Sequence, residues 1–277
     1  MQISEREVAW QQAAQAILQA DALLIGAGAG MGVDSGLPDF RGQEGFWQAY
    51  PMHYGRAFHE LANPVWFRTD PALAWGFYGH RLKLYQATVP HAGFVLLRQW
   101  AEKMPRGYFV FTSNVDGLFQ KAGYEADRIC ECHGSIHYLQ CTGPCQEATW
   151  PADAVTFTIE EKTLRAHGPL PRCHQCQEIA RPNVLMFRDG QWVEDRSRAQ
   201  GRRYLAWLEQ VRGKKVVAIE LGAGTAIPTV RYECERRATT LIRINPREAA
   251  VPTGGIGLAS SALVALQRLQ REMERIR

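Results

Sequence analysis

Residues 22–42 read Ala22-Leu-Leu-Ile25 followed by Gly26-Ala-Gly-Ala-Gly-Met-Gly-Val-Asp-Ser-Gly-Leu-Pro-Asp-Phe-Arg-Gly42. The apolar run predicts a short buried strand, and glycines directly after such a strand let backbone amides approach a pyrophosphate. The spacing departs from the dehydrogenase fingerprint, because the third glycine would fall on Met31 or Val33. A tight turn without a ligand is the alternative. The stretch predicts a strand and loop at which a nucleotide binds.

Three later apolar runs have the same character of buried parallel strands, and they cover residues 108–112, 216–221 and 240–244. Helical patterns alternate with the strands, over residues 6–19, 92–103, 202–212 and 230–237. This alternation predicts an α/β fold with a doubly wound, Rossmann-like parallel sheet, whose ligand site lies at the carboxyl ends of the strands. The loops expected to converge there start at Gly26, Thr112, Gly222 and Asn245.

Two stretches interrupt the alternation and divide the chain. We assign residues 1–42, 86–137 and 181–277 to the nucleotide-binding domain. Residues 43–85, rich in aromatic side chains, form a helical insertion that includes a loop for the nucleotide, and residues 138–180 form a small cysteine-bearing module. Both insertions are expected to cover the carboxyl edge of the sheet.

The cysteine-bearing module contains two closely spaced pairs, Cys141-Thr-Gly-Pro-Cys145 and Cys173-His-Gln-Cys176. Four thiolates complete the tetrahedral shell of Zn²⁺ and leave no position for water, so the predicted zinc is structural. Two pairs of free thiols in loops are the alternative. In the strand expected at residues 129–132, by contrast, the two cysteines serve as small apolar residues.

Composition limits the class of protein. The chain has 277 residues, 46% of them hydrophobic, and a net charge of +4. We find no apolar run long enough to cross a membrane and no signal-peptide core, so we expect a cytoplasmic protein without a membrane partner. Arg196, Arg198, Arg202 and Arg203 form only a loose basic cluster, as on a solvated helix face, and direct nucleic-acid binding is not expected.

His133 directly follows the strand expected at residues 129–132. A histidine at the end of a strand, facing the crevice, can act as a general base because its pKa lies near neutrality. A structural histidine with satisfied hydrogen bonds is the alternative.

Taken together and in this order, these motifs resemble the sirtuin family from about Ala22 to Leu266. The first glycine loop is similar to the first NAD loop of that family. Thr112-Ser-Asn-Val-Asp-Gly117 resembles its nicotinamide-pocket motif, and His133-Gly134 resembles its catalytic histidine motif. The paired cysteines follow at the place where the family carries its structural zinc.

The resemblance implies NAD as co-substrate, with His133, Asn114 and Asp116 as the catalytic group. The residues that it implies around NAD are Gly26, Ala27, Gly28, Asp39, Phe40, Arg41, Ser113, Asn114, Asp116, Gly222, Gly224, Thr225 and Asn245. Asn114 and Asp116 hold the nicotinamide amide, and Phe40 with the loop 42–50 closes over the site. The implied reaction consumes NAD and an acylated lysine of a protein substrate, and it yields nicotinamide, O-acyl-ADP-ribose and free lysine.

Two segments are implied to bind the acylated substrate. Residues 181–189, with Val184, Met186 and Phe187, resemble the segment that pairs with an extended peptide by strand addition. Tyr78 and Arg81 lie three residues apart on one face of a predicted helix, as in the desuccinylase and demalonylase branch of the family. A phenol hydroxyl and a guanidinium suit an acidic acyl tail. A surface arginine beside a packed tyrosine is the alternative.

Three departures from the family pattern keep other functions open. Ser113 replaces a glutamine, Arg188 replaces a glycine, and Gly222-Ala-Gly-Thr225 is an irregular version of the glycine-Thr-Ser loop. An NAD glycohydrolase or a protein ADP-ribosyltransferase on the same fold is one alternative. A module that binds NAD or ADP-ribose without turnover is another.

Overall fold

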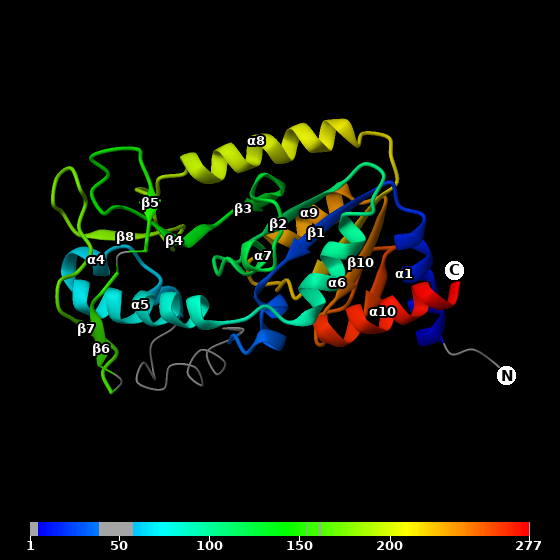
Figure 1. Ribbon diagram of the computed structural model, residues 1–277, viewed down its shortest axis with the longest axis horizontal. Coiled ribbons are helices and arrows are strands. Elements are labelled where there is room, and N and C mark those ends of the chain that lie inside the picture. Colours follow the sequence, from blue (N-terminus) through cyan, green and yellow to red (C-terminus); the bar gives the residue numbers. More distant parts are fainter. Residues whose placement is uncertain (1–4, 39–57, 154, 161, 277) are drawn as a thin grey trace.

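A six-stranded parallel sheet forms the larger lobe of the computed structural model, which describes residues 5–38, 58–153, 155–160 and 162–276 (Figure 1). The strands lie in the order β11-β10-β9-β1-β2-β3, and every neighbouring pair is parallel. They are β1 (Ala22–Ala27), β2 (Tyr108–Thr112), β3 (Ile129–Glu131), β9 (Val216–Leu221), β10 (Thr240–Ile244) and β11 (Ile256–Leu258). The chain moves outward from β1 in both directions, so the predicted doubly wound sheet is confirmed and its switch point lies at β1.

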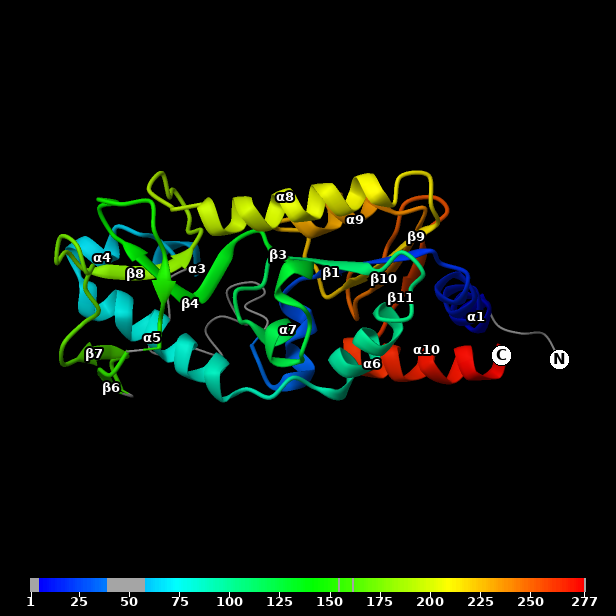
Figure 2. The same cartoon turned by 45° about the horizontal axis from the view of Figure 1, so that its top comes forward.

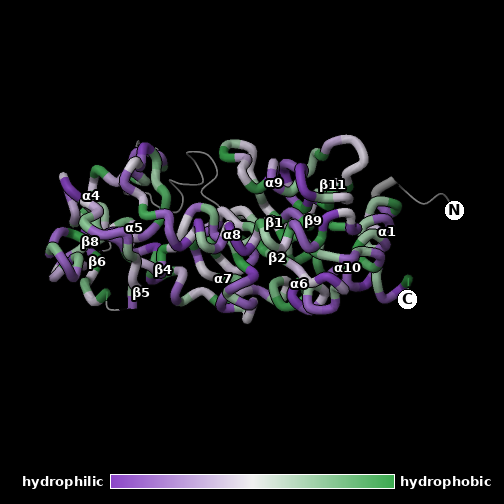
Figure 3. The backbone as a smooth tube through the Cα atoms, turned by 90° about the horizontal axis from the view of Figure 1, so that it is seen from above, coloured by the Kyte–Doolittle hydropathy of each residue, from purple (hydrophilic) through white to green (hydrophobic). Residues whose placement is uncertain are grey.

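Alternating side chains of the strands bury both faces of this sheet. Leu23 and Ile25 pack in the cluster formed with α1 (Glu5–Leu18), α6 (Ala92–Ala101) and α10 (Ala262–Ile276). Leu24 points to the opposite cluster, with α8 (Asp195–Gln210) and α9 (Thr229–Arg237). Helices therefore cover both faces (Figure 2), and the strands carry mostly hydrophobic residues (Figure 3).

The helix expected at residues 202–212 begins earlier, at Asp195. Its first turns carry buried polar residues in place of an apolar stripe, which is why the pattern understated its length. Ser197 donates to Glu131 O at 2.9 Å, and Gln200 Oε1 accepts from Glu131 N at 3.0 Å. These bonds join α8 to β3, just before His133.

The smaller lobe contains the cysteine-bearing module and the described part of the helical insertion, and its sheet also takes in residues 134–137 and 181–184, which the sequence assigned to the nucleotide-binding domain. Its three-stranded antiparallel sheet has the order β5-β4-β8, with β4 (Gly134–Cys141), β5 (Trp150–Pro151) and β8 (Ala180–Val184). A hairpin of β6 (Thr158–Glu160) and β7 (Arg165–His167) packs on α5 (Pro71–Ala87). Gly76 permits this contact, because a Cβ there would lie 1.6 Å from Leu164 O. Residues 181–189 are expected to pair with an extended peptide, and the structure adds that residues 180–184 pair with β4.

The remaining short helices connect these parts. The described portion of the helical insertion adds α3 (Phe58–Leu61) and α4 (Trp66–Thr69), and α7 (Leu118–Lys121) follows the loop after β2. Single 3₁₀ turns lie at η1 (Ala29–Met31), η2 (Val33–Ser35) and η4 (Ala126–Arg128). Within the described residues, none of the helices is both long and apolar enough to span a bilayer.

Candidate active site

A cavity of about 750 Å³ opens at the carboxyl ends of the central strands. Its walls come from the loops after β1, β2, β3 and β9, from α5, and from the segment that follows β8. This is the switch-point crevice that the strand order predicts. Residues from both lobes line the cavity, so the lobes meet at the site.

Two glycine loops form one wall by direct backbone contact. Gly28 N donates to Leu221 O at 3.0 Å, and Gly30 N donates to Gly222 O at 3.1 Å. A Cβ on Gly28 would lie 2.6 Å from the Cα of Ala223, and Gly222 has φ of +60°. Only glycine permits such close approach and such backbone angles at these positions.

The predicted NAD residues of these loops fall into two sets. Gly28, Ser113, Asn114, Asp116, Gly222 and Gly224 line the cavity. The others lie outside its lining: Gly26 and Ala27 are inside β1, and Cys234 Sγ occupies the space at the Cα of Gly26. Asn245 is buried and donates to Ala223 O at 3.0 Å, while Thr225 donates to Glu248 at 2.7 Å. Their contact with NAD stays a prediction. Asp39, Phe40, Arg41 and the loop 42–50 lie outside the described residues.

The loop after β2 places Asn114 and Asp116 on the cavity wall. Asn114 Nδ2 donates to Gly28 O at 3.0 Å, which fixes the side chain against the first loop. Asp116 Oδ1 accepts from Leu118 N at 2.9 Å. Burial raises the pKa of Asp116 to about 6, and the nearby Glu131 carboxylate adds to this effect. The carboxyl group therefore titrates about two pH units above a free aspartate.

His133 lies at the end of β3 and faces the same cavity. Burial lowers the pKa of its imidazole, so the ring is neutral at pH 7 and able to accept a proton. Gly134 follows with φ of +78°, and a Cβ there would lie 2.1 Å from Asn183 O. The glycine lets β4 turn away immediately after the histidine.

The segment after β8 forms the opposite rim. Leu185 N donates to His133 O at 3.0 Å, and Phe187 N donates to Ala62 O at 2.9 Å. Val184 and Met186 are buried in the cavity wall, whereas Phe187 is 37% exposed at its edge. Arg188 has φ of +58°, the left-handed geometry that favours the glycine of the family pattern.

Four aromatic rings surround the guanidinium of Arg81 at the α5 wall. Its Cζ lies 5.4 to 5.8 Å from the ring centroids of Phe58, Phe77, Tyr78 and Tyr85. Nε and Nη2 of Arg81 donate to the Tyr85 hydroxyl at 3.1 and 2.8 Å. Burial raises the pKa of Tyr78 to about 12, so its phenol keeps the proton. Tyr78, Arg81 and Tyr85 all line the cavity.

Tyr85 is a site residue that the sequence reasoning missed. It lies four residues after Arg81, on the same face of the helix, and its own burial also raises its pKa. The helical spacing Tyr78, Arg81, Tyr85 was the available signal. The missed feature extends the predicted pair to three side chains.

The four cysteines of the module come together as the spacing predicts. Their Sγ atoms all lie within 4.8 Å of one another. Cys141 and Cys176 are 3.5 Å apart, and Cys145 and Cys173 are 3.6 Å apart. Sulfurs bound to a tetrahedral zinc at about 2.3 Å lie roughly 3.8 Å apart, so this donor set fits structural Zn²⁺. Arg68 supports the first knuckle by donating to Thr142 O.

The fold and the site together define a nucleotide-binding α/β protein with a structural zinc module and a histidine at its central crevice. The sequence comparison then assigns the family: residues 28–201 match the Sir2 family, and the chain belongs to it.

Curated relatives cover most of the chain. A Pyrococcus furiosus protein named NAD-dependent protein deacylase is 29% identical over 254 residues, which are 90% of this chain and 92% of the relative. An Aquifex aeolicus protein of the same name is 29% identical and covers 81% of this chain and 83% of its own. A Saccharolobus solfataricus protein named NAD-dependent protein deacetylase is 34% identical, over 64% of this chain and 65% of its own.

Solved structures share the fold. A Sir2 homologue in complex with NAD superposes with a TM-score of 0.68 at 22% identity, covering 96% of this chain and 95% of that one. A Sir2 homologue in complex with ADP-ribose gives a TM-score of 0.70 at 22% identity, with 99% and 98% coverage.

Proposed function

We propose that this protein is an NAD-dependent protein lysine deacylase. The observation that carries the proposal is the meeting of His133, Asn114 and Asp116 on one cavity wall, beside two glycine loops that bring backbone groups to the same space. The names of the curated relatives support the same activity. NAD, when bound, supplies the glycosidic bond that is broken and the ribose that receives the acyl group.

The residues of the chain then have separate tasks. Asn114 and the buried Asp116 orient the nicotinamide end, and the carboxyl of Asp116 can donate a hydrogen bond when protonated. His133 is neutral and takes a proton from a ribose hydroxyl at its ring nitrogen. The N–H groups of the rim at residues 185–187 already donate within the protein, so the rim offers its carbonyl groups to an extended peptide. Both lobes shield the reacting atoms from water.

The test is incubation of the protein with NAD and an acyl-lysine peptide. We expect equal amounts of nicotinamide, free lysine peptide and O-acyl-ADP-ribose, and a loss of all three in His133→Ala. Nicotinamide release at an unchanged rate without peptide would favour the NAD glycohydrolase instead. Ser113 motivates that alternative, because a small side chain lines the cavity where the family carries glutamine.

The preferred acyl group is proposed separately as an acidic one, succinyl or malonyl. Arg81 supplies a cation inside the cavity, and the neutral phenols of Tyr78 and Tyr85 add two hydroxyls around it. A guanidinium in such surroundings stabilises a carboxylate more than a methyl group. We expect Arg81→Met to lower kcat/KM for a succinyl-lysine peptide at least tenfold while sparing an acetyl-lysine peptide. An equal loss for both peptides would contradict the acidic preference.

A further inference from the structure

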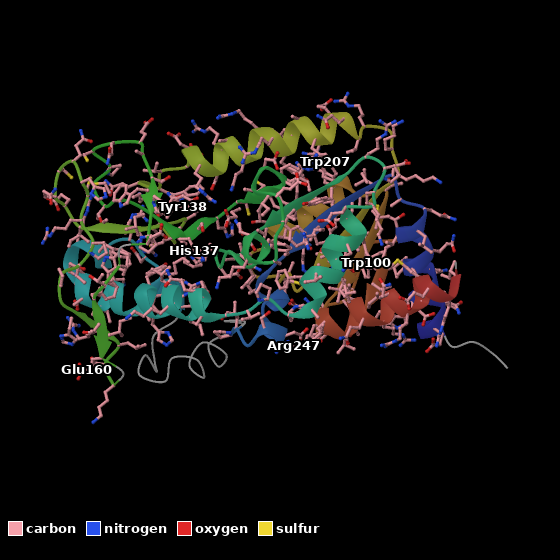
Figure 4. All side chains as sticks on the ribbon, viewed as in Figure 1. Trp100, His137, Tyr138, Glu160, Trp207 and Arg247 are labelled. Atoms are coloured by element: carbon pink, nitrogen blue, oxygen red, sulfur yellow. The ribbon has the colours of Figure 1, made fainter. Side chains whose placement is uncertain are left out.

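His137 approaches the nicotinamide-pocket loop from the other lobe, although the proposed reaction assigns it no role. It lies in β4, four residues after His133, and Figure 4 labels it at β4 in the smaller lobe. Its Nε2–H donates to Asp116 O at 2.8 Å. The histidine thus contacts the backbone of a residue whose side chain lines the cavity.

The ring also packs on the next residue of that loop. Gly117 has φ of +71°, and a Cβ there would lie 2.8 Å from Cδ2 and Nε2 of His137. The missing side chain leaves the space that the imidazole fills. Beside this contact, Ile136 N donates to Val115 O at 3.1 Å. Consecutive residues of β4 therefore hold consecutive residues of the loop.

The local form of β4 explains why this side chain reaches the loop. The pairing of β4 with β8 is interrupted between Ser135 and Leu139, and His137 lies within the interruption. Such irregularities redirect side chains and are frequent beside active sites. On its other edge, His137 O accepts from Ala152 N at 2.9 Å, so the strand is held in place by the zinc-bearing module.

We propose that His137 is a positioning residue for the nicotinamide end of the site, which it sets by fixing the backbone at Asp116 and Gly117. The inference rests on the proposed function, since that function places nicotinamide against Asp116. Loss of the donor leaves Asp116 O without this partner and loosens the loop. The peptide rim and His133 do not depend on this bond, because Leu185 N holds the carbonyl of His133.

The test compares His137→Phe, which keeps a ring but removes the donor, with His137→Gln, whose amide nitrogen donates from a similar distance. We expect the phenylalanine variant to raise KM for NAD and the nicotinamide concentration for half-inhibition by about threefold to tenfold, the usual range for one lost hydrogen bond. KM for the peptide should stay unchanged. The glutamine variant should recover most of both values.

His167→Phe is the matched control, because His167 is an exposed histidine of the same lobe, on β7. Zinc content and Tm of all variants are measured alongside the kinetics. A wild-type KM for NAD together with a wild-type nicotinamide concentration for half-inhibition in His137→Phe would overturn the inference. Equal changes in KM for NAD and for peptide would also overturn it. Calorimetry of NAD binding to each variant tests the role of His137 without turnover. The proposed function fails separately, if the wild-type protein forms no deacylated peptide.

Discussion

Replacing Arg181 by methionine is expected to destabilise the protein strongly, because Arg181 holds a buried ion pair at the rim of the cavity. Arg181 lies in β8 and donates through Nη1 and Nη2 to both carboxylate oxygens of Asp189 at 2.8 Å. Both side chains have 0% exposure. Asp189 also accepts from the backbone nitrogens of Met186 and Gln191 at 3.3 Å. The ion pair therefore closes the turn that carries Phe187 and Arg188.

The expected magnitude follows from burial. Methionine fills a similar volume but leaves the Asp189 carboxylate buried without its cation, and removing one partner of a buried ion pair costs about 3–5 kcal/mol. Each kcal/mol lowers Tm by about 2–4 °C in proteins somewhat smaller than this one, so we expect a fall of roughly 10 °C. The distorted turn should also raise KM for the acyl peptide more than KM for NAD.

Arg165→Met is the matched control for this experiment. Arg165 makes the same two-bond contact with Asp70, at 2.7 and 2.9 Å, but the two side chains are 42% and 30% exposed. Water replaces the lost partner there, so the cost should stay below about 1 kcal/mol. The assay is urea unfolding of each variant, followed by peptide kinetics. Equal losses of stability in both variants would refute the reasoning from burial.

Three further predictions concern the pH dependence, the metal and the histidine strand. Burial raises the pKa of Asp116 in the folded protein to about 6. The protonated carboxyl therefore gives its full contribution to stability below about pH 4, and that contribution is lost as the pH rises through 6. Urea unfolding at several pH values should show the wild type losing stability relative to Asp116→Asn across that window. Removal of zinc with a chelator should unfold the module and lower Tm. Metal analysis before treatment should find a single Zn²⁺ per chain, and the Cys176→Ser variant should bind it weakly. Gly134→Ala should abolish activity and lower Tm, because the added Cβ meets Asn183 O at 2.1 Å; wild-type kinetics in that variant would show that the turn after His133 tolerates a side chain.

Much of the fold was predictable because its signals are local. The apolar runs of β1, β2, β9 and β10 are short and end in glycine or polar loops, and each of them forms a parallel strand as expected. The polar start of α8 was missed because Ser197 and Gln200 are buried through hydrogen bonds to β3, which no periodicity reveals. The pairing of β8 with β4 was missed because Arg181, Pro182 and Asn183 interrupt any apolar run in β8.

The candidate site likewise has features that were predictable from the sequence and features that only the structure shows. The sequence by itself determined the residue types and their order: the glycine loops, Asn114 and Asp116 after one strand, His133 after the next, and two cysteine pairs at zinc spacing. Close spacing along the chain, or a place at a strand end, was enough to expect these groups together.

Only the tertiary structure decided what surrounds them. It removed Gly26 from the cavity wall by packing Cys234 against it, and it joined Tyr85 to Arg81 inside the cavity. It also brought His137 of one lobe to Asp116 of the other. The contact of His137 depends on how the two lobes pack, and that of Cys234 depends on how α9 packs on β1. Contacts between residues so distant in the chain leave no periodic pattern in the sequence. The bond of Tyr85 to Arg81 lies within α5, and the packing around this helix decided that both side chains line the cavity. Local sequence patterns therefore identify the residues of the site, and packing between distant segments determines their geometry.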